Sequence, residues 1–244
     1  MNGSPVIAVT GLKAEAWIAA GPRIRALSGC GDVSGLARRL EAALTNEASA
    51  IISFGVAGGL TPGLAAGAKL VARSVVTEDG AQYYGDPVWS KRLSCALGGA
   101  AIADIAGVDL PVGGPAERLA LHLKTGALAA DTESHVAARA AAARNLPFAA
   151  FRVVADPAHR QLPHAALVAI RPDGSIALGA ILGSLVRDLR QVPQLMRTAN
   201  DARAAFVALF RGRKMLDEAL GFTDFSESLL DLLAEDIFGG TLPV

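Results

Sequence analysis

Short apolar runs alternate with segments of helical periodicity from Val6 to Asp156, and this alternation restricts the fold more than any other feature of the chain. Strands are predicted at Val6–Thr10, Ile24–Ser28, Ala50–Phe54, Lys69–Thr77, Ala101–Val108, Ala127–Ala130 and Phe148–Ala155. Helices are predicted at Leu12–Ala20, Val33–Leu44, Trp89–Leu97, Pro115–Thr125 and Thr132–Asn145. Such alternation favours a sheet covered on both faces. The sequence therefore predicts a single-domain α/β fold with a central, mostly parallel mixed sheet flanked by helices.

Two connecting segments are predicted to lack regular structure. One is the glycine-rich turn Gly55–Gly59, and the other is the polar loop Glu78–Pro87, which holds both tyrosines. Residues 48–68 carry no charge, but glycines and Pro62 interrupt them, so a membrane span is not expected there.

The C-terminal part of the chain differs in charge from the rest. A helix is predicted from Gly179 to Leu220 with a break near Pro193, and the last residues are acidic without a Lys or Arg. A chain of 244 residues is within the range of one α/β domain. We therefore expect residues 1–220 to form the domain and residues 221–244 to form an acidic tail.

Charge and cysteine usage exclude several classes of protein. The chain has 23 basic and 23 acidic residues, which gives no reason to expect a nucleic acid polymer as partner. Its two cysteines form no C-x-x-C pair, its four histidines are expected at the surface, and no metal cluster is predicted. Because no export signal is visible either, a cytoplasmic location is expected.

Polar or glycine-rich residues follow several predicted strands, where ligands of α/β proteins bind. Gly55–Gly59 has glycines spaced as in an anion-binding backbone nest, but it lacks the Lys and Ser/Thr of a P-loop, and a plain tight turn explains it equally well. The turn at Gly29 has one residue too many for a dinucleotide fingerprint. A nicotinamide enzyme is therefore disfavoured.

Carboxylates follow two further strands. Asp131-Thr132-Glu133 opens a predicted helix, whose N-terminus favours negative charge, so a purely capping role is an alternative. Asp156 ends an otherwise apolar strand. Partial burial there raises the pKa of a carboxyl and suits it to donating a proton.

Three of these segments together resemble the signatures of the nucleoside phosphorylase and nucleosidase superfamily. They are Gly55-Val56-Ala57-Gly58-Gly59-Leu60, Asp131-Thr132-Glu133 and Arg152-Val153-Val154-Ala155-Asp156. Within the superfamily the chain is most similar to methylthioadenosine/S-adenosylhomocysteine nucleosidases and to hopanoid-biosynthesis-associated phosphorylases. The resemblance implies cleavage of the N-glycosidic bond of an adenine nucleoside.

The resemblance also implies a role for each matching residue. Asp156 is the expected general acid at the base, and Glu133 is expected to bind ribose hydroxyls and to steady developing positive charge. The remaining expected substrate contacts are Thr132, Gly58, Asp109 and Val112, the last two in a loop that covers the base. Glu15 lies near the position of a water-activating glutamate, with a slip of one residue.

The nucleophile is left open between water and inorganic phosphate. The residues expected at its site are Ser28, Gly29, Arg25 and Val56. Phosphorylases place an Arg and a Ser where this chain has Ser53 and Val56, which weakens the phosphate site. Arg23 and Arg25 are candidates to supply replacement cations, but arginines on a short edge strand are more often simply solvated. Apart from phosphate as a co-substrate, no cofactor is expected.

The expected partner is a small-molecule nucleoside, and the resemblance favours an adenosine linked to a hopanoid lipid. The basic stretch Arg187–Lys214 is either a solvated helix or a surface that meets anionic lipid at the membrane periphery. A homo-oligomer is expected by analogy, and an apolar face is predicted in the tail at Leu229, Leu230, Leu232, Leu233, Ile237 and Phe238. The alternatives are a methylthioadenosine/S-adenosylhomocysteine nucleosidase and a non-catalytic nucleoside-binding protein.

Overall fold

The computed structural model describes residues 4–29, 32–45, 48–161 and 192–222. Its elements in chain order are β1 Val6–Thr10, α1 Lys13–Ala19, β2 Ile24–Ser28, α2 Val33–Leu44, β3 Ala50–Gly59, β4 Lys69–Thr77, β5 Gln82–Tyr84, α3 Pro87–Ala96, β6 Ala101–Gly107, α4 Pro115–Thr125, β7 Ala129–Asp131, α5 Ser134–Ala143, β8 Phe148–Asp156 and α8 Val192–Met215. The predicted alternation of strands and helices is confirmed.

The strands form one sheet in which a ring is closed by β8. The strand order is β2-β1-β3-β7-β6-β4-β5, and β8 pairs with both β3 and β4. The pairs β1–β2, β1–β3, β3–β8, β4–β6 and β6–β7 are parallel, whereas β3–β7, β4–β8 and β4–β5 are antiparallel. The sheet is therefore mixed and mostly parallel, as predicted, and β3, β7, β6, β4 and β8 form a closed circuit.

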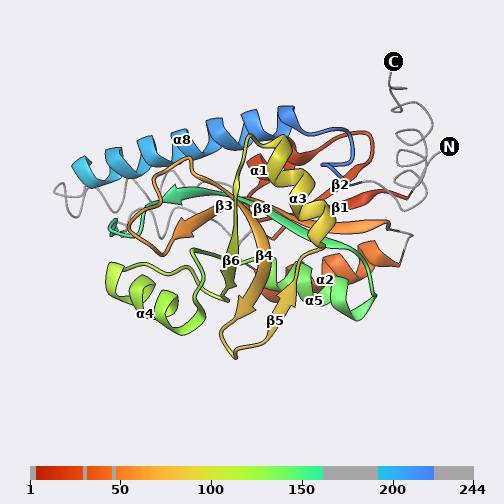
Figure 1. Ribbon diagram of the computed structural model, residues 1–244, viewed down its shortest axis with the longest axis horizontal. Coiled ribbons are helices and arrows are strands. Elements are labelled where there is room, and N and C mark those ends of the chain that lie inside the picture. The colour runs from red at the N-terminus through yellow and green to blue at the C-terminus, as the bar shows by residue number, and fades with distance from the viewer. Residues whose placement is uncertain (1–3, 30–31, 46–47, 162–191, 223–244) are drawn as a thin grey trace, which may run out of the picture.

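Helices cover both faces of the sheet (Figure 1). Alternate residues of β1 point to opposite faces, so that Val6 packs in a core with α1, α3 and α8, while Ile7 packs in a second core with α2 and α5. This is the predicted three-layer arrangement. It buries every residue of β1, consistent with a strand that has neighbours on both edges.

The prediction that a turn begins at Gly55 is wrong, because β3 continues through Gly59. Gly55 and Gly58 still pair with β8, opposite Arg152 and Asp156, and Gly58 also pairs with Ala130 of β7. Glycines are needed here for close packing rather than for a turn. A Cβ on Gly55 would lie 2.7 Å from Cδ of Glu15.

Two other predicted boundaries differ from the structure. The loop Glu78–Pro87 contains the short strand β5, which pairs with β4. Pro193 does not break the last helix but lies in the first turn of α8, where a missing N–H costs no hydrogen bond. That helix ends at Met215, before the predicted Leu220, and residues 179–191 of the prediction lie outside the described residues.

The described chain ends in the core just beyond the proposed domain boundary. Phe222 is buried and its ring lies 5.0 Å, between centroids, from that of Trp89. Residues 223–244, with the predicted apolar face of the tail, lie outside the described residues. Among the helices that the structure describes, none combines the length and the hydropathy needed to cross a bilayer.

Candidate active site

The predicted acidic residues lie on the two sides of the glycine segment of β3. Gly58 pairs with Ala130, one residue before Asp131, on one side and with Asp156 on the other. Because β7 runs antiparallel to β3, the segment that carries Glu133 turns back toward the start of the glycines. The topology thus brings both predicted carboxylates to one stretch of backbone.

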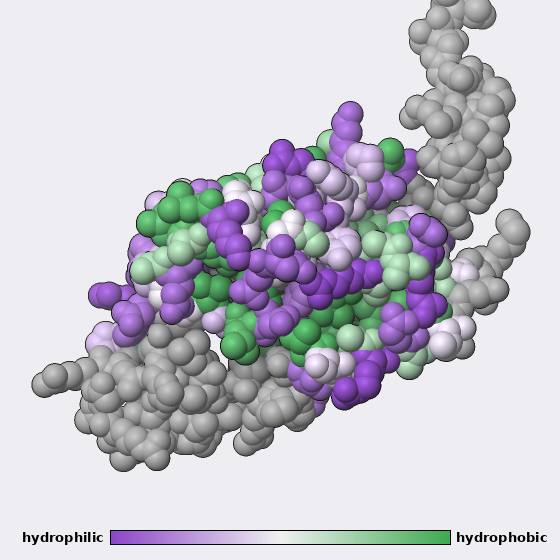
Figure 2. All heavy atoms as spheres, turned by 90° about the horizontal axis from the view of Figure 1, so that it is seen from below, coloured by the Kyte–Doolittle hydropathy of each residue, from purple (hydrophilic) through white to green (hydrophobic). Residues whose placement is uncertain are grey.

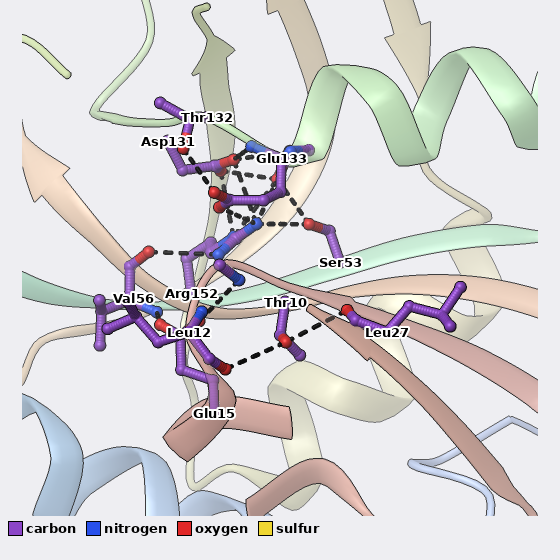
Figure 3. A network of polar contacts seen from close by, with 12 residues as sticks. Thr10, Leu12, Glu15, Leu27, Ser53, Val56, Asp131, Thr132, Glu133 and Arg152 are labelled. Carbon is purple, nitrogen blue, oxygen red and sulfur yellow. Dashed lines mark hydrogen bonds and ion pairs between the residues drawn. The ribbon is translucent and has the colours of Figure 1, made fainter. Parts of the chain in front are cut away.

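Arg152 is the centre of a buried polar network (Figure 3). Its side chain is fully buried, and its Nε and Nη2 each lie 3.1 Å from an oxygen of Asp131. Nη2 lies 3.5 Å from Oε2 of Glu133, and Nη1 donates to the carbonyl of Val56 at 3.2 Å. The hydroxyl oxygens of Ser53 and Ser134 also accept hydrogen bonds from this guanidinium. A buried guanidinium with this many acceptors has a fixed orientation.

The side chain of Glu133 packs closely against the residues that follow β1 and β2. A Cβ on Gly11 would lie 3.0 Å from Oε1 of Glu133, and one on Gly29 would lie 3.3 Å from its Cγ. The hydroxyl of Thr132 donates to Oε1. Burial raises the pKa of Glu133 to about 7, Arg152 opposes this rise, and the charges of Asp131 and Glu15 add to it.

Glu15, near the start of α1, binds backbone N–H groups with both carboxylate oxygens. Oε2 accepts from Gly11 at 2.7 Å and from Leu12 at 2.8 Å, and Oε1 accepts from Val56 at 2.8 Å. Burial raises the pKa of Glu15, against the effects of Arg152 and of these hydrogen bonds. The structure therefore places Glu15 and Val56, predicted separately, in direct contact.

The network holds more carboxyl groups than cationic groups. One guanidinium, that of Arg152, interacts with the carboxylates of Asp131, Glu133 and Glu15. A buried excess of negative charge favours retention of a proton and attracts a cation. The cluster is therefore suited to exchanging a proton near neutral pH and to stabilising positive charge on a bound molecule.

Asp156 forms a second centre with Arg118, a residue of α4. Nη2 of Arg118 pairs with Oδ2 of Asp156, and the two side chains are 1% and 17% exposed. A Cβ on Gly58 would lie 3.3 Å from the same oxygen, so a side chain there would press on the carboxylate of Asp156. Burial raises the pKa of Asp156, and the charge and hydrogen bond of Arg118 oppose the rise.

The loop Asp109–Gly114, which is expected to cover the base, contacts Arg118 and His135. The carbonyl of Val112 accepts from Nε of Arg118 at 3.2 Å. Oδ1 of Asp109 lies 3.0 Å from Nε2 of His135. The expectation that His135 lies at the surface is wrong, because the side chain of His135 is 2% exposed, packed against Gly107. Burial lowers the pKa of His135, against the charges of Asp131 and Asp109.

The residues predicted for the phosphate or water site separate into two groups. Gly29 lies against Glu133, and Val56 donates to Glu15. The carbonyls of Ser28 and Gly29 accept from Arg39. Arg25 is exposed, and its Nη1 donates to the carbonyl of Ala43 near the end of α2 at 3.4 Å, so the structure does not bring it to the Arg152 network.

Sequence reasoning missed the two arginines that organise these centres. Arg152 carried a signal, because a charged residue inside an apolar strand requires buried partners. Arg118 carried none, since it lies in a helix with polar and apolar residues on several sides. Among the described residues, no group of three or more His, Cys, Asp or Glu side chains is arranged to hold a metal ion.

The chain is similar to known proteins in sequence and in fold. The sequence profile of the phosphorylase superfamily matches residues 8–187. No curated protein sequence matches the chain.

Several solved structures share its fold. A Helicobacter pylori MTAN mutant with 5′-methylthioadenosine in its active site is 13% identical, with a TM-score of 0.58 over 88% of this chain and 100% of that one. Streptococcus pyogenes S-adenosylhomocysteine nucleosidase in complex with 5-methylthiotubericidin is 16% identical, with a TM-score of 0.57 over 87% and 98% of the two chains. Helicobacter pylori futalosine hydrolase is 12% identical, with a TM-score of 0.57 over 86% and 97%. At these identities the likeness shows a common fold.

Proposed function

Because the chain belongs to the phosphorylase superfamily of enzymes, we propose that it cleaves the N-glycosidic bond of an adenine nucleoside, with water as the nucleophile. The proposal depends most on one observation, the placement of two acids, the buried Glu133 and the half-buried Asp156, on opposite sides of the glycine segment of β3. The nucleosidase complexes described above support adenine as the base.

Asp156 acts at the base. Cleavage moves the electron pair of the C1′–N9 bond onto the purine, which becomes a good leaving group once N7 is protonated. Burial keeps a proton on Asp156 to a higher pH than is usual for an aspartate. Asp156 donates this proton to N7 and becomes an ionised carboxylate beside Arg118.

Glu133 acts at the sugar. Loss of the base leaves positive charge on the ribose, and a preorganised negative environment stabilises that charge as it develops. The excess of carboxylates around Arg152 supplies such an environment. Ionised Glu133 also accepts hydrogen bonds from the ribose hydroxyls.

Glu15 makes water the better nucleophile. Its carboxylate already accepts from the N–H groups of Gly11, Leu12 and Val56, donors that would otherwise be open to an anion. A phosphate ion would compete with Glu15 for these donors and would add charge to a negative cluster. Water adds none, and Oε1 of Glu15 accepts its proton as the water oxygen bonds to C1′.

The hopanoid-linked substrate is a narrower part of the proposal and is supported by the resemblance of the signatures alone. It concerns the 5′ substituent of the nucleoside, which is remote from the bond that breaks. Two residues within the basic stretch make contacts inside the domain. Asp201 pairs with Arg160, and Arg213 donates to carbonyls that include those of Ala19 and Asp217. These contacts favour structural roles for that part of the stretch.

The nucleophile and the substrate are tested together. Purified protein is incubated with adenosine, 5′-methylthioadenosine and adenosylhopane in detergent, with and without phosphate, in water enriched in oxygen-18. We expect adenine release that is independent of phosphate, with the label at C1 of the ribose. Ribose 1-phosphate as product would overturn the choice of water. Tight binding of the nucleosides without adenine release would favour a non-catalytic binding protein.

A further inference from the structure

We propose that Arg118 is a positioning residue that links the loop over the base to the general acid, so that Asp156 is held for proton transfer when the loop is in place. The proposal rests on the function proposed above, since it concerns how Asp156 acts. It assigns a role to a residue of α4 that neither the sequence motifs nor the comparisons single out.

The burial pattern of α4 is the first observation. Arg118 is the one buried residue of this helix, with 1% of its surface exposed. Leu119 and Leu123 of the same helix are 53% and 75% exposed. Figure 2 looks onto the side of the molecule where α4 lies and shows hydrophobic side chains open at the surface. A helix that buries an arginine and exposes leucines opposes the hydrophobic effect, so the arginine must be required by its contacts.

Those contacts join three segments at the site. Nε of Arg118 donates to the carbonyl of Val112 in the loop at 3.2 Å. Nη1 lies within hydrogen-bond distance of three carbonyls, those of Asp156 at 3.0 Å, Pro157 at 3.3 Å and Gly59 at 3.4 Å. Nη2 pairs with the carboxylate of Asp156. One planar guanidinium therefore fixes the loop, the end of β3 and the end of β8 relative to one another.

The pairing also determines which oxygen of the acid meets the base. Nη2 contacts Oδ2 of Asp156. Within the described part of the chain, Oδ1 has no donor, so it is the oxygen available to carry and deliver the proton. A carboxyl held by one oxygen has its other oxygen aimed in one direction, which is the geometry that proton transfer requires.

The charge of Arg118 assists the same step. When the proton moves from Asp156 to N7, the C1′–N9 electron pair goes to the purine and the carboxylate gains a negative charge. Arg118 is already in place to stabilise that charge. A neighbouring cation lowers the pKa of a carboxyl and so makes it a stronger acid. If the loop carrying Val112 moved away, Nε of Arg118 would lose its acceptor and the guanidinium would be less constrained.

The test compares Arg118→Met and Arg118→Lys with wild type on two substrates. Adenosine needs protonation of its leaving base, whereas p-nitrophenyl riboside leaves as a stable anion and does not. For Arg118→Met on adenosine we expect kcat to fall about 100-fold and the loss of activity at high pH to move upward. Activity on p-nitrophenyl riboside should stay within about threefold. Arg118→Lys keeps the charge but not the fork of donors, so an intermediate loss is expected.

A matched control is Arg73→Met, which breaks another arginine–aspartate pair, with Asp104, at the surface. Arg73→Met should leave the activity on both substrates unchanged. Equal losses on both substrates, or an unchanged pH profile in the Arg118 variants, would overturn the role of Arg118. If Arg118→Met does not fold, the same comparison on Arg118→Lys decides. Failure of wild type to release adenine would instead contradict the proposed function itself.

Discussion

The carboxylate of Glu133 lies 3.5 Å from the guanidinium of Arg152, which is closer, at 3.1 Å, to Asp131. Arg152 therefore compensates Asp131 better than it compensates Glu133. The consequence is that Glu133 is the acid in this network whose pKa rises to about 7, mainly because it is buried. In the proposed mechanism, the carboxylate that stabilises the ribosyl cation is thus incompletely neutralised by Arg152 until the substrate supplies positive charge.

Glu133 should make the stability of the protein depend on pH. Its pKa is about 7 in the folded state and near 4.5 when unfolded, so its protonation stabilises the fold fully below pH 4.5 and this contribution is lost as pH rises through 7. The shift corresponds to at most about 3 kcal/mol. Relative to wild type, Glu133→Gln should therefore gain free energy of unfolding between pH 4.5 and pH 8. Urea unfolding at both pH values measures this, and a difference that does not vary with pH contradicts the assignment.

Glu15→Gln should slow the reaction without weakening adenine binding. A glutamine amide cannot accept a proton from water, and its NH₂ group would face one of the N–H donors of Gly11, Leu12 or Val56. We expect kcat on adenosine to fall by a factor of about 100 or more. Calorimetry should give an unchanged Kd for adenine, because the proposed mechanism places the base at Asp156. A rate within threefold of wild type would remove Glu15 from the mechanism.

Gly55→Ala tests the packing between Glu15 and Arg152. The added Cβ would lie 2.7 Å from Cδ of Glu15 and 2.8 Å from Nη1 of Arg152, so the two side chains must separate. Overpacking of this kind costs about 1–3 kcal/mol, and adenine release should fall with it. Gly63→Ala is the matched control, since nothing lies within 4 Å of its Cβ position. Equal melting temperatures and rates for the two variants would contradict the packing described here.

The sequence was sufficient for most of the elements, although β5 lies in a segment predicted as a loop. Apolar runs such as Val6–Thr10 are buried on both faces and could be assigned as strands. The ring of strands could not be predicted, because the pairing of β8 with both β3 and β4 depends on contacts between distant segments. The local sequence pattern was also misleading at Gly58, where residues typical of a turn continue the strand β3.

The role of Arg118 was beyond sequence reasoning for a different physical reason. Whether a cation is buried depends on acceptors that other segments supply, and Arg118 receives them from Val112, Gly59 and Asp156. Nothing in the pattern of α4 indicates this. The same applies to His135, whose burial against Gly107 follows from the packing of α5 on β6.

The most direct test of the account is adenine release by wild type and by Asp156→Asn, followed as free base over time at neutral pH. Asparagine keeps the size of the side chain but has no acidic proton. We predict that wild type releases adenine from adenosine-type nucleosides and that Asp156→Asn does so at least about 100-fold more slowly, with an unchanged circular dichroism spectrum. Equal rates in the two proteins, or no release of adenine by wild type, would contradict the central claim that Asp156 protonates the leaving base.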